Sequence, residues 1–346
     1  MDKTPTDKTD SAHHTVPKFY LKGFRSESGQ LTKWDRATGK VKRASVKFAS
    51  TAKGYYTILD KNKEETDVVE NLYMKVEDGA KPIFEKMMCV FPYIPEYNSE
   101  DRMIISQYLA MQTTRTKAFR RRSQLICDNI CKQIAMLKLA HKKTPLSDIE
   151  FKYLQNPHQF GEICQSQDSL SVHELDFADE IQPFFYYRPW IIVVFDEPSL
   201  ITSDTPVFIL PNDDIRGYPN NGLAISREYW FPLDSKHLLI LGDPLCAYPF
   251  KRDIVLCPDG TDATNTLLRQ CCKASNDMQI TNCHMEAYGQ MSLLRKYDGK
   301  PLPKNAPFYV GGNNSFNSYY NEAKMDMEPI LGHGTYAREM FASDET

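Results

Sequence analysis

The ordered part of the chain is expected to begin at H-H-T-V-P-K-F-Y-L-K-G-F, residues 13–24, after twelve polar and charged residues. Two histidines, a proline and three aromatic residues stand within these twelve positions. Phe19, Leu21 and Phe24 would anchor the stretch in a hydrophobic core. His14 precedes Pro17 by three residues, and its imidazole either packs beside the first structured turn or serves a function. The stretch is therefore both the expected start of the fold and a candidate site.

Length and composition indicate an ordinary globular protein. The chain has 346 residues, 41% of them hydrophobic and 25% charged, and a formal net charge of -3. This balance provides no overall attraction to nucleic acid or anionic lipid, so any polyanion binding would be local. We expect a disordered leader over residues 1–12, one compact domain over 13–300 with a candidate sub-boundary near 141–183, and an irregular tail over 301–346.

Cysteine usage and hydropathy bear on the cellular compartment. The chain has nine cysteines, no C-x-x-C, no apolar region in its leader and no run of eighteen apolar residues. An odd number of cysteines without a signal peptide predicts reduced thiols, so we expect a soluble, cytoplasmic protein without a membrane segment. Cys127 with Cys131, and Cys283 with His284, are the nearest approach to a zinc site, but buried thiols are the favoured interpretation. The oligomeric state is left open.

The first half of the chain predicts a small hairpin region followed by helices. Residues 31–42, L-T-K-W-D-R-A-T-G-K-V-K, indicate a hairpin with Gly39 at the turn, and residues 52–58 a third strand. An amphipathic helix is predicted over 66–88, capped by Asp67 and bent at Pro82. A long central helix is predicted over 100–142. Its expected buried stripe comprises Ile105, Tyr108, Leu109, Phe119, Ile126, Ile130, Ile134 and Leu137.

Three polar residues interrupt that stripe. Gln112 and Thr116 project to the middle of the apolar face, and Arg115 projects to its edge. A buried glutamine or arginine without partners costs about 1 to 3 kcal/mol. The middle of the helix therefore faces either a buried structural network, which is the favoured alternative, or a functional pocket.

The second half predicts a sheet. After two short helices within 141–183, the chain has runs rich in β-branched and aromatic residues at 190–195, 200–210 and 229–241. Between the last two runs, P-N-D-D-I-R-G-Y-P-N-N-G (211–222) is a polar loop of the kind that lines sites, and residues 261–295 are predicted to be helical. The fold class is therefore α+β, with a long central helix and further helices on a mostly antiparallel sheet.

Several common catalytic and nucleotide-binding motifs are absent, which makes some classes of chemistry less probable but identifies none. There is no phosphate-binding glycine loop, no G-x-G-x-x-G, no G-x-S-x-G and no H-E-x-x-H. In S-D-T-P-V (203–207), Asp204 stands at a strand end, where it either accepts backbone N–H groups in a turn, the favoured alternative, or acts as a catalytic carboxylate. The basic run at 114–122 spreads Lys117, Arg120, Arg121 and Arg122 around the helix, which favours a solvated face over nucleic-acid binding.

Several short motifs together resemble the domain-of-unknown-function family 4238, which is mainly bacterial. They are H-x-x-P-x-x-Y-L-x-x-F from His14 to Phe24, the pair Gln112 and Arg115, T-S-D-T-P-V (202–207) and F-P-L-D-S (231–235). Glu77 and Asn282 also resemble recurring positions of the family. The similarity extends over residues 13–295 and implies one shared α+β architecture, but it implies no activity.

The resemblance singles out His14, Gln112, Arg115 and Asp204, the same polar residues that the physical interpretation found awkwardly placed. If they converge, Arg115 would hold an anion, His14 would transfer a proton, and Asp204 would orient His14 or bind a divalent metal. The expected function is thus an intracellular hydrolase or nuclease-like effector acting on a phosphate-bearing substrate, in a bacterial defence or toxicity setting. The alternative is a non-catalytic sensor or a module that binds an anion or nucleic acid.

Overall fold

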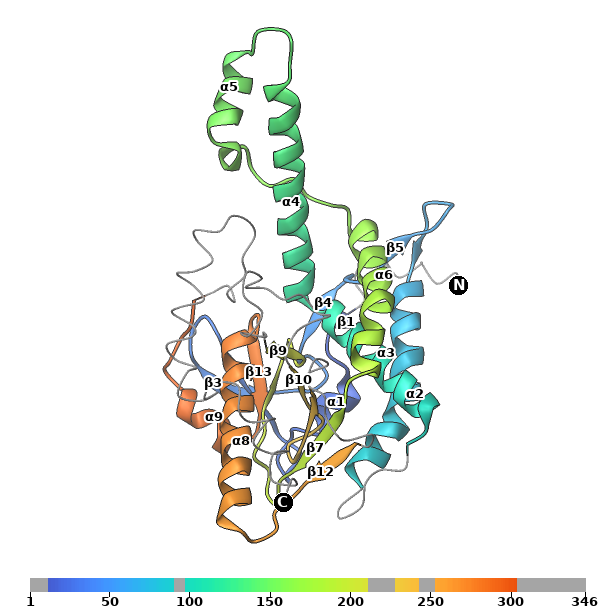
Figure 1. Ribbon diagram of the computed structural model, residues 1–346, viewed down its shortest axis with the longest axis vertical. Helices are drawn as coiled ribbons and strands as arrows, with labels where there is room; N and C mark the ends of the chain where they lie inside the picture. The colour runs from blue at the N-terminus through green and yellow to red at the C-terminus, as the bar shows by residue number, and fades with distance from the viewer. Residues whose placement is uncertain (1–11, 90–96, 211–227, 243–252, 304–346) are drawn as a thin grey trace, which may run out of the picture.

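A computed structural model describes residues 12–89, 97–210, 228–242 and 253–303 of the chain (Figure 1). The predicted loop at 211–222 and nearly all of the leader and tail lie outside these residues. The α+β class is confirmed, with helices and mostly antiparallel sheets in one assembly. The helices of the first two thirds are α1 (Lys18–Lys22), α2 (Val68–Met88), α3 (Ser99–Thr114), α4 (Lys117–Ala140), α5 (Asp148–Gln155), a 3-10 turn η2 (Pro157–Phe160) and α6 (Gln167–Tyr186).

Two small sheets and a four-stranded sheet contain the N-terminal strands. Strand β1 (Ala12–His14) pairs with β4 (Thr51–Lys53), and β5 (Ile58–Leu59) pairs with β6 (Glu65–Thr66). The predicted hairpin is present as β2 (Leu31–Asp35) and β3 (Val41–Ala44), and Gly39 at its turn has a positive φ of 67°. This hairpin is extended by β13 (Glu286–Gly289) and then β8 (Thr202–Ser203), so that both ends of the described chain contribute to one sheet.

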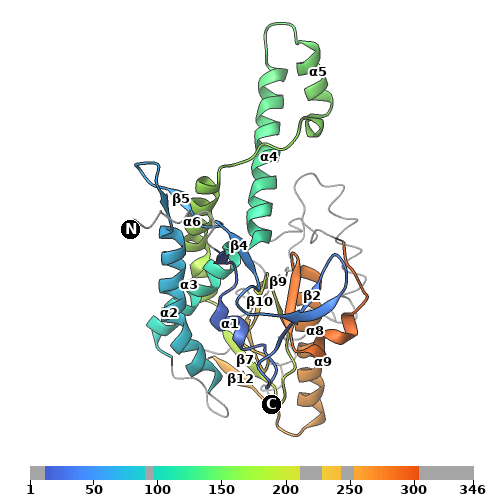
Figure 2. The same cartoon turned by 180° about the vertical axis from the view of Figure 1, so that it is seen from behind.

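The five-stranded sheet is the centre of the molecule. Its order is β12 (Ile254–Leu256), β7 (Trp190–Val194), β11 (His237–Leu241), β10 (Glu228–Pro232) and β9 (Phe208–Leu210), and only the β12–β7 pair is parallel. The predicted apolar runs supply β7, β9, β10 and β11, whose aromatic and β-branched side chains are mostly buried, whereas β12 was not predicted and is only partly buried. Helices α2, α3 and α6 lie on one side, and α8 (Asp262–Asn282), α9 (Met291–Leu294) and the 3-10 turn η3 (Arg295–Tyr297) lie on the other (Figures 1 and 2).

The predicted central helix over 100–142 is two helices. Helix α3 ends at Thr114, Arg115 is its C-cap, and the Thr116 hydroxyl accepts from the Phe119 N–H to cap α4. The polar residues at 112–116 that interrupt the apolar stripe therefore mark a change of direction. Helix α4 and α5 then project away from the body as an arm (Figure 2). The stripe from Ile126 to Leu137 is exposed rather than buried, so that part of the prediction was wrong.

Two further predictions need correction. Residues 261–295 are not helical throughout, because α8 ends at Asn282 and β13 follows it as a central strand of the four-stranded sheet. Asp67 occupies the N-cap position of α2, but its carboxylate accepts from the Thr57 hydroxyl at 3.2 Å and caps no helix N–H. In both cases long-range pairing overrides a local preference.

The predicted N-terminal anchors do reach the main hydrophobic core. Leu21 and Phe24 are fully buried, and the partly buried ring of Phe19 packs against Phe84 and Tyr108. The buried Tyr20 hydroxyl donates to the Pro232 carbonyl at 2.8 Å and shares a hydrogen bond with Thr202 at 2.7 Å. This short segment therefore joins the helical layer to both larger sheets.

Candidate functional site

Both histidines of the N-terminal stretch are buried, although the spacing favoured only His14. His13 is 3% exposed and His14 is 8% exposed. The His13 ring stacks on Tyr56 and accepts the Tyr56 N–H at Nδ1, 2.8 Å away, while Nε2 lies 3.6 Å from the Asp67 carboxylate. Burial lowers the pKa of His13, against the attraction of Asp67. His13 therefore holds the Tyr55–Tyr56 segment in place.

Gln112 and Arg115 bind the main chain of the same stretch. Gln112 Nε2 donates to the Thr15 carbonyl at 3.1 Å, and Arg115 Nη2 donates to the carbonyl of His14. Positions i and i+3 of a helix lie on one face, so the C-terminal end of α3 binds two consecutive carbonyls at the end of β1. The structure thus brings together three of the four predicted site residues, but His14 takes part here through its backbone.

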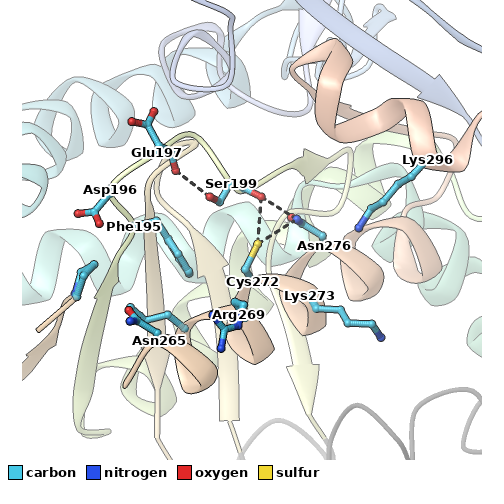
Figure 3. A pocket seen from close by; sticks show the side chains of 12 residues that line it. Phe195, Asp196, Glu197, Ser199, Asn265, Arg269, Cys272, Lys273, Asn276 and Lys296 are labelled. Atoms are coloured by element: carbon cyan, nitrogen blue, oxygen red, sulfur yellow. Dashed lines mark hydrogen bonds between the residues drawn. The ribbon is translucent and has the colours of Figure 1, made fainter. Parts of the chain in front are cut away.

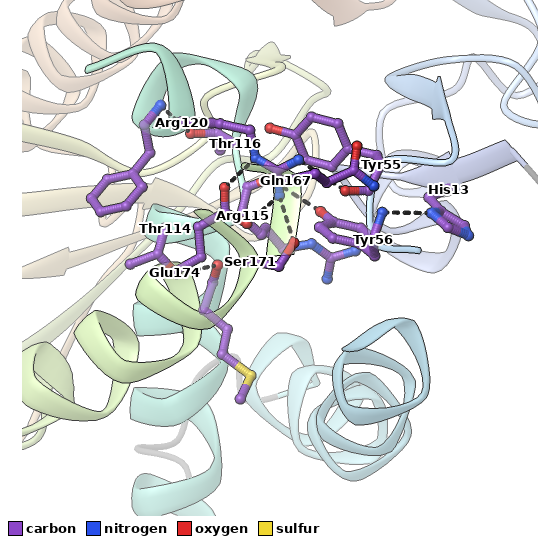
Figure 4. Close-up of polar contacts among 12 residues, drawn as sticks. His13, Tyr55, Tyr56, Thr114, Arg115, Thr116, Arg120, Gln167, Ser171 and Glu174 are labelled. Carbon is purple, nitrogen blue, oxygen red and sulfur yellow. Dashed lines mark hydrogen bonds and ion pairs between the residues drawn. The ribbon is translucent and has the colours of Figure 1, made fainter. Parts of the chain in front are cut away.

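The Arg115 side chain is enclosed in an ion-pair and aromatic cage. Nη1 donates to the Glu77 carboxylate at 2.6 Å, and the guanidinium lies over the Tyr73 ring, 4.6 Å from its centroid. Only 2% of the side chain is exposed. The Tyr56 hydroxyl donates to the Arg115 carbonyl at 3.1 Å (Figure 4). Glu77, which entered only through the family resemblance, is therefore the direct partner of Arg115.

Asp204 binds the backbone at the start of β13 and not the N-terminal stretch. Its carboxylate accepts three backbone N–H groups, from His284 and Met285 at 2.7 Å each and from Glu286 at 3.2 Å. These bonds hold the start of β13 against the end of β8. Burial raises the pKa of Asp204 to about 6, although the three hydrogen bonds oppose this. Among the hydrogen bonds and ion pairs of the described residues, none joins Asp204 to His14, Gln112 or Arg115.

The facing surfaces of α2 and α3 add residues that the sequence did not single out. Glu70 and Glu77 lie seven residues apart on α2, and Tyr108, Gln112 and Arg115 recur at intervals of four and three on α3. These spacings place each set on one helix face. We call the following residues the Arg115 cluster: His14, Glu70, Glu77, Tyr108, Gln112 and Arg115. The spacing of Glu70 and Glu77, seven residues apart on one face of α2, was the sequence signal that could have identified Glu70.

The Arg115 cluster contains many polar atoms without partners. Within the described residues, the following buried atoms of the cluster have no hydrogen-bond partner: His14 Nδ1, Glu70 Oε2, Tyr108 Oη, Gln112 Oε1 and Arg115 Nε. Buried polar groups in native proteins are almost always satisfied by protein, water or ligand. A convergence of donors and acceptors at one helix contact therefore indicates a place for ordered water or a polar ligand.

Burial shifts the pKa values of Glu70 and His14 in opposite directions. Burial raises the pKa of Glu70 to about 7, Arg115 opposes the rise, and Glu77 and Asp67 add to it. Burial also lowers the pKa of His14 to about 4, with help from the nearby Lys18 charge. At neutral pH the imidazole is uncharged, while Glu70 is divided between its acid and its base form. A carboxyl group with this pKa is suited to proton transfer.

Binding a divalent metal is one of the two roles that the sequence left open for Asp204, and the described part of the chain has no preformed ligand set for it. No group of three histidine, cysteine, aspartate or glutamate side chains there is arranged to hold a metal ion. Glu77 is occupied by Arg115 and Asp204 by backbone N–H groups.

The cations of the basic run at 114–122 have hydrogen-bond and ion-pair partners, which a fully solvated face would lack. Arg120 forms two hydrogen bonds with the Glu174 carboxylate, at 2.6 and 2.7 Å, and lies 3.6 Å from the centroid of the Tyr55 ring (Figure 4). Lys117 donates to the Thr51 carbonyl at 2.9 Å, and Arg121 pairs with Glu162. Phosphate contacts by these three cations would compete with existing partners, which weakens the nucleic-acid alternative.

A separate cavity of about 520 Å³ lies between α8, η3 and the segment after β7. Arg269, Lys273 and Lys296 line one side, and Asp196 and Glu197 line the other (Figure 3). At its floor, Asn276 donates to the Ser199 carbonyl and accepts the Ile201 N–H, so this amide fixes the wall of the cavity. Its lining charges are on exposed side chains, and we regard the Arg115 cluster as the better candidate site.

Fold and site together define an α+β protein with a buried polar cluster between two helices and its N-terminal segment. The chain belongs to the family described as "Protein of unknown function (DUF4238)", whose model matches residues 12–291. This confirms the resemblance drawn from the short motifs. No curated protein and no solved structure matches the chain.

No helix in the described ranges is both long and apolar enough to cross a membrane. The cysteines that the structure describes are all unpaired.

Proposed function

We propose that the chain is a hydrolase and that the Arg115 cluster is its active site. The observation that supports the proposal is the set of unpartnered buried polar atoms in this cluster, which includes Glu70, whose pKa is raised to about 7. A general base is most effective when its pKa lies near the working pH. Glu70 is half-buried and Glu77 is 19% exposed, so the cluster reaches solvent along α2.

In the proposed reaction, water is held by acceptors and activated by Glu70. Gln112 Oε1 or His14 Nδ1 can accept one hydrogen of a water molecule, and the ionised Glu70 carboxylate can remove the other as a proton. The oxygen then attacks the electrophilic centre of the substrate, and the proton on Glu70 passes to the leaving group. The free N–H of Arg115 Nε and the Tyr108 hydroxyl can donate to the negative charge that develops.

The predicted phosphate-bearing substrate is best narrowed to a phosphodiester. Arg115 has already paired one nitrogen with Glu77, so it offers one free donor rather than a bidentate fork. The exposed Lys18 is a second cation whose charge acts on both Glu70 and His14. A singly charged diester suits this balance better than a dianionic monoester.

The experiment compares the full chain with Glu70→Gln on phosphodiester, phosphomonoester and carboxyl-ester substrates. Gln keeps the size of the side chain and removes the base, so we expect kcat to fall by about 10²- to 10⁴-fold. Glu85→Gln, an exposed position on the same helix, is the matched control and should leave the rate unchanged. Hydrolysis that persists in Glu70→Gln would disprove the assignment of the base.

A binding module is the second candidate, supported by the same unpartnered atoms, since a ligand could satisfy them without any reaction. It becomes the better account if the wild-type chain hydrolyses none of the three substrate classes. The expected defence or toxicity setting and the cytoplasmic location remain predictions. Expression of the chain in a bacterial host, with and without Glu70→Gln, tests the first by growth, and fractionation of the natural host tests the second.

A further inference from the structure

Helix α4 is amphipathic, but it buries its polar face and exposes its apolar face. Its polar residues Gln124, Asp128 and Lys132 are 8%, 5% and 3% exposed, because they face the segment that precedes α6. Gln124 accepts the Gln165 N–H at 3.0 Å, and Asp128 accepts the Ile163 N–H at 2.8 Å. The polar face is thus the one that the chain itself covers.

The apolar face of the same helix is turned to solvent. Its exposed fractions are 43% at Ile126, 49% at Ile130, 47% at Ile134 and 61% at Leu137. At 100° per residue these positions fall within about 80° of one another, which makes a continuous stripe. A helix of a globular protein normally buries such a stripe. We call these four side chains the α4 stripe.

The surroundings of the stripe indicate an uncharged partner. Between Ile126 and Leu137 the only charged residues are Asp128 and Lys132, which pair with each other at 2.9 Å on the covered face. At the base of the arm Arg120 pairs with Glu174, and at its tip Lys142 pairs with Glu150. A polyanion would gain little at such a surface, whereas an identical neutral stripe would meet no like-charge repulsion.

We propose that the α4 stripe is a dimer interface occupied by the same stripe of a second copy of this chain. The arm projects from the body in both views, so the sheets do not obstruct a second arm lying along it (Figures 1 and 2). A two-fold interface is self-complementary, and isoleucine against isoleucine satisfies this requirement. Stable interfaces take about 20 to 30 residues from each partner, so one face of the 24-residue helix α4 forms a smaller interface, which suits a dimer that dissociates on dilution.

The experiment measures the mass of the full chain by sedimentation over a range of concentrations. The wild type is expected to be a dimer that dissociates on dilution. Ile130→Asp places a charge in the middle of the stripe and should raise the dissociation constant by roughly tenfold or more. Val172→Asp is the matched control, because Val172 is 49% exposed on α6, outside the stripe, and should leave the dimer intact.

Three results would overturn the proposal: a wild type that stays monomeric, a dimer that survives Ile130→Asp, or a dimer that Val172→Asp disrupts equally. Should Ile130→Asp fail to fold, Ile130→Ser and Ile134→Ser remove apolar surface without adding charge and must still weaken the dimer. Binding of a monomeric chain to phosphatidylcholine vesicles would identify a membrane surface as the occupant instead. The result does not depend on hydrolysis.

Discussion

At the scale of single residues, burial decides what each polar group can do. His14 and Glu70 lie in one cluster, yet burial lowers the pKa of the His14 imidazole and raises the pKa of the Glu70 carboxyl group. Both groups therefore favour their uncharged forms, as desolvation requires. Arg115 keeps its charge because Glu77 and the His14 carbonyl replace the water that it loses. The four predicted site residues are all buried, and what each can do depends on its partners.

Glu70 makes the stability of the folded chain depend on pH. Its folded pKa of about 7 exceeds the ordinary value of 4.5, so the folded state holds this proton more tightly than the unfolded state. The resulting stabilisation is complete below pH 4.5 and is lost as the pH rises through 7. Chemical denaturation at pH 5 and pH 8 should show a smaller loss of stability in Glu70→Gln than in the wild type. Equal losses in the two proteins would contradict the raised pKa.

Arg115 should be costly to remove. Arg115→Ala leaves Glu77 without its partner and removes the hydrogen bond to the His14 carbonyl, so we expect the free energy of unfolding to fall by about 3 to 5 kcal/mol. Arg121→Ala, in the exposed pair with Glu162, is the control and should cost less than about 1 kcal/mol. Urea denaturation of both variants measures the difference. If Arg115→Ala cost no more than Arg121→Ala, the clamp on β1 would have no energetic weight.

At the scale of secondary-structure elements, the break between α3 and α4 organises the site. Periodicity alone predicted one helix, because apolar residues continue at helical spacing beyond residue 116. The structure ends α3 where Arg115 turns inward, and Thr116 begins α4 in a new direction. The side chains at 112–116 that violated the apolar pattern were therefore the sequence signal for the break. The direction of the arm depends on contacts with residues 163–165, which lie far away in sequence.

The Thr116 cap should contribute measurably to the start of α4. Thr116→Val keeps the β-branched shape and removes the oxygen that accepts the Phe119 N–H at 3.1 Å, so we expect a loss of about 1 kcal/mol. Hydrogen exchange should accelerate at the Phe119 amide. Thr113→Val, whose hydroxyl instead donates to the Leu109 carbonyl within α3, is the control. Unchanged exchange at Phe119 in Thr116→Val would show that the cap does not stabilise the first turn.

At the scale of the whole molecule, the N-terminal stretch acts as a connector. Tyr20 reaches the four-stranded sheet through Thr202 and the five-stranded sheet through Pro232. Thr15 shares a hydrogen bond with Ser50, whose N–H donates to the Tyr288 hydroxyl. Residues separated by more than 200 positions are thereby joined through a segment of about ten residues. Such contacts have no trace in local periodicity.

Tyr20→Phe tests this connection with little change in packing. The ring remains and its hydroxyl is lost, which leaves the Pro232 carbonyl without this donor in a buried site. We expect unfolding to require about 1 to 3 kcal/mol less free energy. Tyr187→Phe is the control, because Tyr187 is 80% exposed on the far end of α6. Equal melting temperatures for the wild type and Tyr20→Phe would show that the hydroxyl bridge carries no weight.

The sequence by itself determined the α+β class, the β2–β3 hairpin, α2, most of α8, the burial of Leu21 and Phe24, and membership of the family. These follow from alternation, helical spacing, turn residues and short motifs, all of which act over a few positions. Tertiary structure alone decided that Glu70 joins His14, Gln112 and Arg115, that Asp204 secures β13, and that the apolar stripe of α4 faces outward. The physical reason is that desolvation and partner choice depend on residues distant in sequence, which no local pattern records.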